Sequence, residues 1–476
     1  MASLLDCPEE LLTCIFDSTP RSGLRSLSLV NRRMRQSVEP YLYTNVEFLW
    51  ENVYEHTPIP LFLRTIIRRP ELGNRVRSLA LRGTALYPPP HERSLPWEGE
   101  SPPKVIIDES VNQELIAAVR GIYVSFKDLW IWRLRSGTMD AFVALLLSRL
   151  PNLEKFYYGP NFAGDTQLTG MMLRAALCDN SRQQFKQELP ELVRLEEVTW
   201  CGAVDPCFRN RPINTRDALS IFYLPNVKRV EAQIEEPISF SWPAGAPDPL
   251  HLTSLDLTHV RESLLEDLLK VTRGLKSLRW RWYHTDTGPG SNPNEEPIHE
   301  DITINLDQFM MAIYHVRNTL TELTIYGGED TGGEAMSDNR PDLSIQGSLR
   351  GIVQFDKLVK FEVPVSLLMS PFEEVHSDIQ IEGVLPPNVE ILHIKDDSEY
   401  YPTEWDGENL FPLIESWLRS GHWKQVNPHL KGFSMAIASQ SPAGGWSPLL
   451  SQAVEEICKD AGIRYHFTKY DWEFGS

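Results

Sequence analysis

The side chains best suited to catalysis or metal binding are scattered along this chain, and their spacing matches no established site. His284, Asp286 and the run His-Glu-Asp at 299–301 could ligate a cation, but they flank a stretch rich in Gly, Pro and Asn and lack the spacing of metal ligands. The adjacent acids at 235–236 and 396–397 point away from each other, so they make poor acid–base pairs. We expect solvated loops at these positions rather than clusters of ligands or catalytic groups.

The cysteines and the short catalytic motifs lead to the same expectation. Cys201 and Cys207 lie near Trp200 without an obvious histidine partner, and a buried thiol is the simpler interpretation. The sequence has no Gly-x-Ser-x-Gly, no His-Glu-x-x-His and no Walker-type glycine loop. We therefore expect a protein that is not an enzyme and has no cofactor or metal. An enzyme with an unrecognised site stays as an alternative.

Protein recognition is the chemistry that the aromatic and arginine side chains favour. Several short segments follow the pattern L-x-x-L-x-L, and alternate side chains of a strand point to opposite faces. If the apolar side chains of each strand face the core, the side chains between them line the opposite, concave face. Tryptophan, tyrosine and arginine, which are common in interface hot spots, then lie on the concave face at Trp130, Trp132, Tyr157, Arg279, Arg281 and Tyr326. A register shifted by one residue would bury Trp130 and Trp132 instead.

The pattern that positions these residues recurs along most of the chain. It predicts strands at 76–81, 126–131, 153–158, 195–200, 227–232, 252–257, 275–280, 320–325, 358–363, 389–394 and 430–435, and a closing strand at 463–467. Apolar residues at helical spacing predict helices near 142–150, 264–271, 309–316, 413–418 and 449–457. Strand, helix and strand in succession imply right-handed crossovers and stacked parallel strands. We predict an α/β fold built as an irregular leucine-rich-repeat-like horseshoe solenoid.

The spacing of the repeats is irregular. The strand centres Leu255 and Leu278 are 23 residues apart, but Leu79 and Leu129 are 50 apart, whereas regular leucine-rich repeats run roughly 20–29 residues. Either loops are inserted or a strand has been missed, and a generic α/β fold remains the alternative. Segments rich in Pro, Gly or Asn mark inserted loops near 84–103, 283–298 and 327–341. These loops are expected to be solvated, although they could order on a partner.

The first fifty residues predict three short helices. Apolar residues at helical spacing follow Asp6, which can cap the first helix. Thr19-Pro20 and Gly23 interrupt the pattern before the second helix, and Pro40 is expected to end the third. So small a unit buries little of its apolar surface by itself. It should therefore pack on another protein, or serve as an ordinary helical cap on the rest of the chain.

Three segments of this helical region follow a recognisable motif. They are Cys7-Pro8-Glu9-Glu10-Leu11-Leu12-x-x-Ile15-Phe16, Leu24-x-x-Leu27-Ser28-Leu29-Val30-Asn31-Arg32 and Pro40-x-Leu42-Tyr43. Together they resemble the F-box motif, most of all that of fungal F-box proteins with leucine-rich-repeat-like tails. The match spans about a tenth of the 476 residues, and Cys7 departs from it because the family usually has Leu there. The resemblance implies an F-box-like helical domain at 1–47, and the solenoid then occupies 48–476.

The resemblance also implies a role in ubiquitin transfer. In that family the F-box binds a Skp-type adaptor, which bridges to a cullin-RING ubiquitin ligase, and the tail holds a protein target. The implied adaptor-binding residues are Leu5, Pro8, Leu11, Leu12, Ile15, Phe16, Leu24, Leu27, Val30 and Met34. The implied function is that of a substrate receptor. An adaptor-bound scaffold outside any ligase is the alternative.

Composition limits the partners and the compartment. The net charge of −19 and the pI of about 5.1 argue against a nucleic-acid partner, which would need a basic surface. No apolar run reaches the roughly 18 residues of a membrane span, and the N-terminus has no basic start of a signal peptide. The six cysteines form no Cys-x-x-Cys. We expect reduced thiols, a cytoplasmic or nuclear location and no membrane partner.

Overall fold

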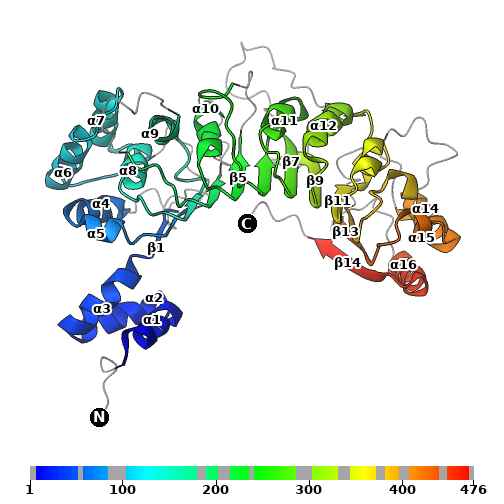
Figure 1. The fold of residues 1–476 in the computed structure, drawn as a ribbon, viewed down its shortest axis with the longest axis horizontal. Helices are drawn as coiled ribbons and strands as arrows, with labels where there is room; N and C mark the ends of the chain where they lie inside the picture. The colour runs from blue at the N-terminus through cyan, green and yellow to red at the C-terminus, as the bar shows by residue number, and fades with distance from the viewer. Residues whose placement is uncertain are drawn as a thin grey trace, which may run out of the picture. The chain divides into compact units, whose positions relative to one another are not determined.

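The computed structural model describes residues 7–51, 57–83, 103–178, 189–201, 215–234, 241–285, 303–330, 344–370, 381–395, 407–438 and 448–470. Internal contacts divide the chain into two units, Met1–His251 and Leu252–Ser476, and we describe each by itself. Figure 1 labels the helices and strands of both units. Most of each predicted insert (84–102, 286–298 and 331–341) lies outside the described residues.

Three short helices begin the first unit: α1 (Glu9–Ser18), α2 (Arg21–Val30) and α3 (Arg32–Leu42). Asn31 caps α3 by accepting a hydrogen bond from the Met34 N–H at 2.8 Å. Asp6, predicted to cap α1, lies outside the described residues, and Pro8 occupies the cap position. Pro40 was wrongly predicted to end α3, which continues through Leu42. In the last turn a proline removes only one backbone hydrogen bond, and its fixed φ still suits the helix.

These three helices share a small core of their own. The buried residues are Phe16, Leu24, Met34 and Val38, and Leu12, Ile15, Leu27, Tyr41 and Leu42 pack against them. The rings of Phe16 and Tyr41 meet edge to face with centroids 5.2 Å apart, and the Tyr41 hydroxyl donates to Thr13 Oγ1 at 3.1 Å. The helices therefore bury part of their apolar surface without help from the rest of the chain.

An ion pair and an aromatic stack join α3 to the helices that follow it. Two nitrogens of Arg69 each lie 2.8 Å from a carboxylate oxygen of Glu39, and the hydrogen bond from Arg69 lowers the pKa of Glu39. Tyr43 stacks on Phe62 of α4 (Ile59–Arg68), with ring centroids 5.9 Å apart. These contacts hold the end of α3 near the first strand, β1 (Asn45–Leu49).

Parallel strands form the sheet of the first unit in chain order. They are β1, β2 (Ser78–Arg82), β3 (Lys155–Tyr158), β4 (Glu197–Trp200) and β5 (Arg229–Gln233). The strands keep one register, so buried Leu79 pairs with Phe156, and Phe156 pairs with Val198. Buried and outward residues alternate along each strand, as the repeat pattern predicts. The predicted boundary at residue 47 falls inside β1, a strand that the pattern missed.

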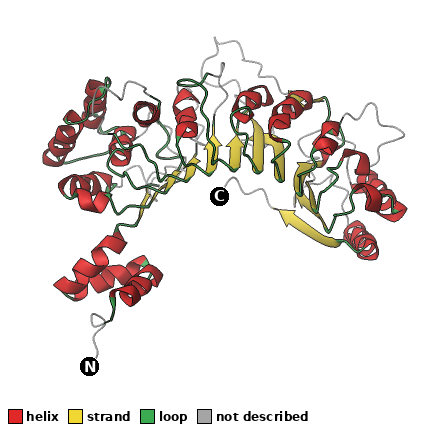
Figure 2. Ribbon diagram, viewed as in Figure 1, coloured by secondary structure: helices red, strands yellow, loops and turns green. Residues whose placement is uncertain are grey.

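Helices cover one face of this sheet, as Figure 2 shows. They are α4, α5 (Pro70–Gly73), α6 (Glu109–Arg120), α7 (Lys127–Arg135), α8 (Met139–Leu147), α9 (Gln167–Leu177), α10 (Thr215–Ala218) and the 3-10 turn η4 (Leu219–Tyr223). Every residue of α8 is buried, so this helix forms the centre of the layer. The other face of the sheet has none of these helices, and we call it the open face.

The second unit repeats this architecture. Its parallel strands are β6 (Ser254–Thr258), β7 (Ser277–Thr285), β9 (Glu322–Asp330), β11 (Lys360–Pro364), β12 (Ile391–Lys395), β13 (Gly432–Ala438) and β14 (Arg464–Tyr470). One face carries α11 (Glu262–Leu269), α12 (Leu306–Ile313), α13 (Val365–Leu368), α14 (Gly407–Ser420), α15 (Trp423–Val426), α16 (Pro448–Ala461) and the turns η5 (Tyr314–Val316), η6 (Arg350–Gln354) and η7 (Ile381–Val384) (Figure 2). A separate parallel pair joins β8 (Thr303–Asn305) and β10 (Ser344–Gln346). The predicted α/β class with parallel strands is therefore confirmed.

The strand predicted at 126–131 is wrong, because α7 begins at Lys127 and Phe126 is its cap residue. Trp130 and Leu134 are both fully buried, and a spacing of four residues places them on one side of a helix. The Trp130 indole N–H donates to the Ala141 carbonyl of α8 at 3.0 Å. The segment fits the strand pattern and the helix pattern equally well, and packing against α8 decides between them. The other predicted strands and the predicted helices are present.

Two of the predicted loops begin later than expected. β7 continues to Thr285 and β9 to Asp330, although loops were predicted from 283 and 327. The two strands pair residue by residue up to Thr285 and Asp330. These backbone hydrogen bonds outweigh the low strand preference of Gly327-Gly328.

Candidate functional site

The predicted adaptor-binding residues divide into an inner and an outer set on α1, α2 and α3. Phe16, Leu24 and Met34 form the small core, so the prediction that they line a docking surface is wrong. Their side chains are needed to hold three short helices together. Leu12, Ile15 and Leu27 are half-buried against that core, Pro8, Leu11 and Val30 are exposed, and Leu5 lies outside the described residues.

The outer surface of these helices is apolar and basic at once. Leu11 is 54% exposed, Val30 is 65% exposed and Leu29, which the prediction did not include, is 79% exposed. Exposed arginines also lie on α2 and α3: Arg21, Arg25, Arg32, Arg33 and Arg35. Glu39 is the one acidic residue of α2 and α3. In a chain of net charge −19, this surface is suited to an acidic partner with apolar contacts.

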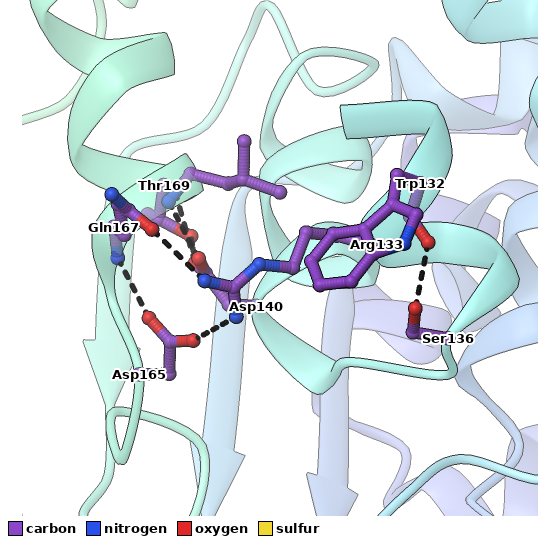
Figure 3. Close-up of polar contacts among 8 residues, drawn as sticks. Trp132, Arg133, Ser136, Asp140, Asp165, Gln167 and Thr169 are labelled. Atoms are coloured by element: carbon purple, nitrogen blue, oxygen red, sulfur yellow. Dashed lines mark hydrogen bonds and ion pairs between the residues drawn. The ribbon is translucent and has the colours of Figure 1, made fainter. Parts of the chain in front are cut away.

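The tryptophans predicted for target binding lie in the helix layer of the first unit instead of on a strand. Trp130 is buried inside the layer, so its predicted contact with a target is wrong. Trp132 is 59% exposed and has the Arg133 guanidinium 5.6 Å from its ring centroid. Figure 3 shows Arg133 reaching from α7 toward Asp165 and Gln167. A nitrogen of Arg133 lies 2.6 Å from an Asp165 oxygen. These contacts join α7 to the start of α9.

A buried carboxylate completes the packing at the start of α9. Asp140 of α8 accepts hydrogen bonds from the backbone N–H groups of Leu168 and Thr169 and from the Thr169 hydroxyl (Figure 3). Burial, followed by the nearby charge of Asp165, raises the pKa of Asp140 to about 7. The carboxylate satisfies the first N–H groups of a helix, so we assign it a structural role.

The open face of the first unit carries charges that are largely paired. Arg82 lies 2.6 Å from Glu47, and Lys155 lies 3.0 Å from Glu197. Tyr157, a predicted target-binding residue, is half-buried beneath the Arg82 guanidinium, which is 4.8 Å from its ring centroid. Burial, and then the nearby Cys201, raises the pKa of Tyr157 to about 12. This face offers an aromatic contact but no clear excess of one charge.

The open face of the second unit brings Arg279, Arg281 and Tyr326 together as predicted from their alternation. Paired strands align Asp256 with Arg279 and place Arg281 beside Tyr326. Two nitrogens of Arg281 contact Asp256, at 2.8 and 3.1 Å, and one nitrogen of Arg279 contacts it at 3.3 Å. One carboxylate therefore engages two guanidinium groups.

Lys395 extends this group of charges, and the prediction did not include it. Its Nζ lies 3.5 Å from the Tyr326 ring centroid and 3.7 Å from Glu362, whose carboxylate accepts a hydrogen bond from the Tyr326 hydroxyl. The same alternation could have found Lys395, because Leu392 and Ile394 face the core on β12. We call Asp256, Arg279, Arg281, Tyr326, Glu362 and Lys395 the arginine–lysine cluster.

Ser434 and His393 lie beside Glu362 of this cluster, in the order of a hydrolase triad. The Ser434 hydroxyl is hydrogen-bonded to His393 Nδ1, but His393 Nε2 lies 3.8 Å from Glu362, beyond hydrogen-bond range. Backbone N–H groups of paired strands point at neighbouring strands within the sheet. The described part of this face therefore presents no pair of N–H donors for an oxyanion, which acyl transfer requires.

Metal binding finds no support in the described residues. Among them, no three His, Cys, Asp or Glu side chains are grouped as ligands for an ion. Asp286, the run 299–301 and both acidic pairs at 235–236 and 396–397 lie outside the described residues, as does Cys207. Cys201 is half-buried near Tyr157.

Comparison with known proteins leaves the family open. No protein-family model matches the chain, and no curated protein sequence is significantly similar to it. None of the described helices combines the length and the apolar character that crossing a membrane requires.

Proposed function

We propose that this protein is the substrate-recognition subunit of a Skp–cullin–F-box ubiquitin ligase. The observation that supports the proposal best is the outer surface of α1, α2 and α3. Three short helices coincide with the F-box-like segments, bury a small core, and leave Leu11, Leu29 and Val30 exposed, along with the arginines of α2 and α3. Leu29 and Val30 adjoin each other at the end of α2, and adjacent exposed apolar residues are typical of a protein-binding surface. The proposed occupant is a Skp-type adaptor, which would link the chain to a cullin.

The two α/β units would hold the protein target as a leucine-rich-repeat-like solenoid. Their open sheet faces present outward side chains in fixed rows, which is the form of a rigid recognition surface. The chain would contribute no catalytic group. It would accelerate ubiquitin transfer by holding the target close to the ligase, because a fixed geometry removes much of the entropy cost of the encounter.

Titration calorimetry with a purified Skp-type adaptor tests the docking surface. The double variant Leu11→Ser with Val30→Ser should bind at least about tenfold more weakly, because a few contact residues carry most of the affinity of an interface and each substitution removes apolar contact area. The side chains of both residues are more than half exposed, so the variant should fold.

Leu449→Ser is the matched control. Leu449 of α16 is 77% exposed and lies in the second unit, so its loss should leave the affinity for the adaptor unchanged. Equal affinities of the wild type and the double variant would refute adaptor docking through this surface.

An adaptor-bound scaffold is the remaining alternative, because it would use the same docking surface. Affinity purification of the wild type and of Leu11→Ser with Val30→Ser separates the two. A ligase subunit recovers both the adaptor and a cullin, and loses both in the variant. A scaffold recovers the adaptor without a cullin.

A further inference from the structure

Among the contacts that the structure describes, the arginine–lysine cluster holds more cations than anions. Its cations are Arg279, Arg281 and Lys395, whereas its anions are Asp256 and Glu362. The whole chain has a net charge of −19, so the cluster opposes the charge of the molecule around it. Salt screens distant charges beyond about 8 Å at physiological ionic strength, so the groups nearest to Arg279 and Lys395 affect a bound segment more than the net charge of the chain does.

Arg279 is the most accessible donor of the cluster. One of its nitrogens contacts Asp256 at 3.3 Å, and its side chain is 51% exposed. Arg281 is the less exposed of the two, at 26%, and binds the same carboxylate with two nitrogens. A guanidinium has five N–H donors in a planar fork. Arg279 can therefore bind a second carboxylate while Arg281 keeps Asp256 in place.

Lys395 marks the other end of the cluster. Its side chain is 22% exposed, and it lies over Tyr326 beside Glu362. Burial lowers the pKa of Lys395 to about 8, Glu362 opposes this shift, and Arg279 and Arg281 add to it. The two arginines therefore create a positive potential at Lys395, which a bound anion would relieve.

We propose that the arginine–lysine cluster binds a carboxylate-rich segment of the protein target, with Arg279 and Lys395 as its contact points. The described contacts of the cluster hold one more cation than anions, which matches a side-chain carboxylate better than a phosphate of nearly two negative charges. Two parallel N–H groups of an arginine fork also fit a carboxylate. This inference rests on the proposed function, because it names the class of target that the receptor would recognise.

Binding of such a segment should depend on pH between 7 and 9.5. A carboxylate beside Lys395 favours the charged amine, so the pKa of Lys395 rises on binding. The complex then holds more protons than the free protein, and the affinity falls as pH increases through about 8. The described charges that act on Lys395 are Glu362 beside it and Arg279 and Arg281 on β7, and the Tyr326 ring lies under its amine. His393 precedes Lys395 by two residues on β12, and His466 of β14 acts on His393. Burial lowers the pKa of His393 from 6.5, so His393 loses its charge below this pH window.

A fluorescent peptide of six glutamates is the probe, and the full-length chain is the protein. Fluorescence anisotropy should detect binding at pH 7 and an affinity about tenfold lower at pH 9.5. Arg279→Gln should weaken binding at pH 7 by about tenfold, because it removes a charged hydrogen-bond donor. Lys395→Met should also weaken binding at pH 7, and should remove the dependence on pH.

Lys360→Met and a peptide of six glutamines are the matched controls. Lys360 lies on the same sheet, 3.8 Å from Glu322 and 53% exposed, so its loss changes the net charge by the same amount outside the cluster. It should leave both the affinity and its pH dependence in place, and the glutamine peptide should not bind. Thermal melting of each variant confirms that it is folded.

Three results would overturn the proposal. They are no binding of the glutamate peptide at pH 7, an unchanged pH dependence in folded Lys395→Met, and binding of a phosphoserine peptide without binding of the glutamate peptide. The peptide assay requires neither adaptor nor ligase. Its failure with intact adaptor binding would refute the target class alone, whereas failed adaptor binding with intact peptide binding would refute the ligase role.

Discussion

Two tryptophans two residues apart in α7 should differ sharply in their contribution to stability. Trp130 is fully buried and hydrogen-bonded to Ala141, whereas Trp132 is 59% exposed. Trp130→Ala should lower the free energy of unfolding by about 3–5 kcal/mol, the range for a buried aromatic. Trp132→Ala should change it by less than about 1 kcal/mol, as surface substitutions do. Urea denaturation of the two variants measures this difference, and equal losses would contradict the helical assignment.

The same pair shows where residue-level prediction from the sequence ends. In a strand, Trp130 and Trp132 would share one face, and in a helix they point in different directions. Nothing in the local sequence separates these cases, because Leu129 and Ile131 suit either. By contrast, Arg279 and Arg281 alternate with Leu278 and Trp280, which are too apolar to face water, so their outward direction could be predicted.

At the scale of elements, Gly83 joins three segments that are distant in the sequence. It follows β2 with φ +146°, and an added Cβ would lie 2.2 Å from the Trp50 carbonyl oxygen and 2.5 Å from Asn161 Nδ2. Asn161 in turn donates to that carbonyl at 2.6 Å. Gly83→Ala should therefore cost roughly 3 kcal/mol or more, because it combines backbone strain with overlap against backbone atoms.

Gly421, after α14, is the matched control for Gly83. It also has a positive φ, +70°, but an added Cβ meets no described atom within 4 Å. Gly421→Ala should cost only about 1 kcal/mol, the usual penalty for a left-handed residue with a side chain. Thermal or urea unfolding of both variants compares them, and similar losses would show that the close approach at Trp50 is not rigid.

The strands were predicted correctly where only one face of the strand is buried. The strands β5, β6 and β12 alternate cleanly between buried and outward residues, so a period of two is visible in the sequence. β1 was missed because the helical motif before it was extended by two or three residues too many. The role of Gly83 could not be predicted, because it depends on contacts with residues 50 and 161.

At the scale of the whole molecule, the helices α1, α2 and α3 are the part to remove in a test of solubility. They bury their own core but expose Leu11, Leu29 and Val30. A chain beginning at Tyr43 keeps β1 and the Tyr43–Phe62 stack. It should stay folded and aggregate less than the full chain when no adaptor is present, because exposed apolar patches promote association.

Light scattering and circular dichroism of both chains provide the measurement. Equal solubility would mean that the apolar residues on α2 do not drive association, which would weaken the case for a docking surface there. Loss of the circular dichroism signal in the shortened chain would show instead that the three helices stabilise the first sheet.

The common register of the strands has a consequence for engineering. Leu255 and its partner Leu278 are only 23 residues apart in the sequence, whereas Leu79 and its partner Phe156 are 77 apart. Both pairs are nevertheless in register on neighbouring strands. Loop length and strand alignment are therefore independent in this chain. A designer could graft a new set of outward residues onto β7, β9 and β12, and lengthen the connections between them, without redesigning the interior that supports the grafted surface.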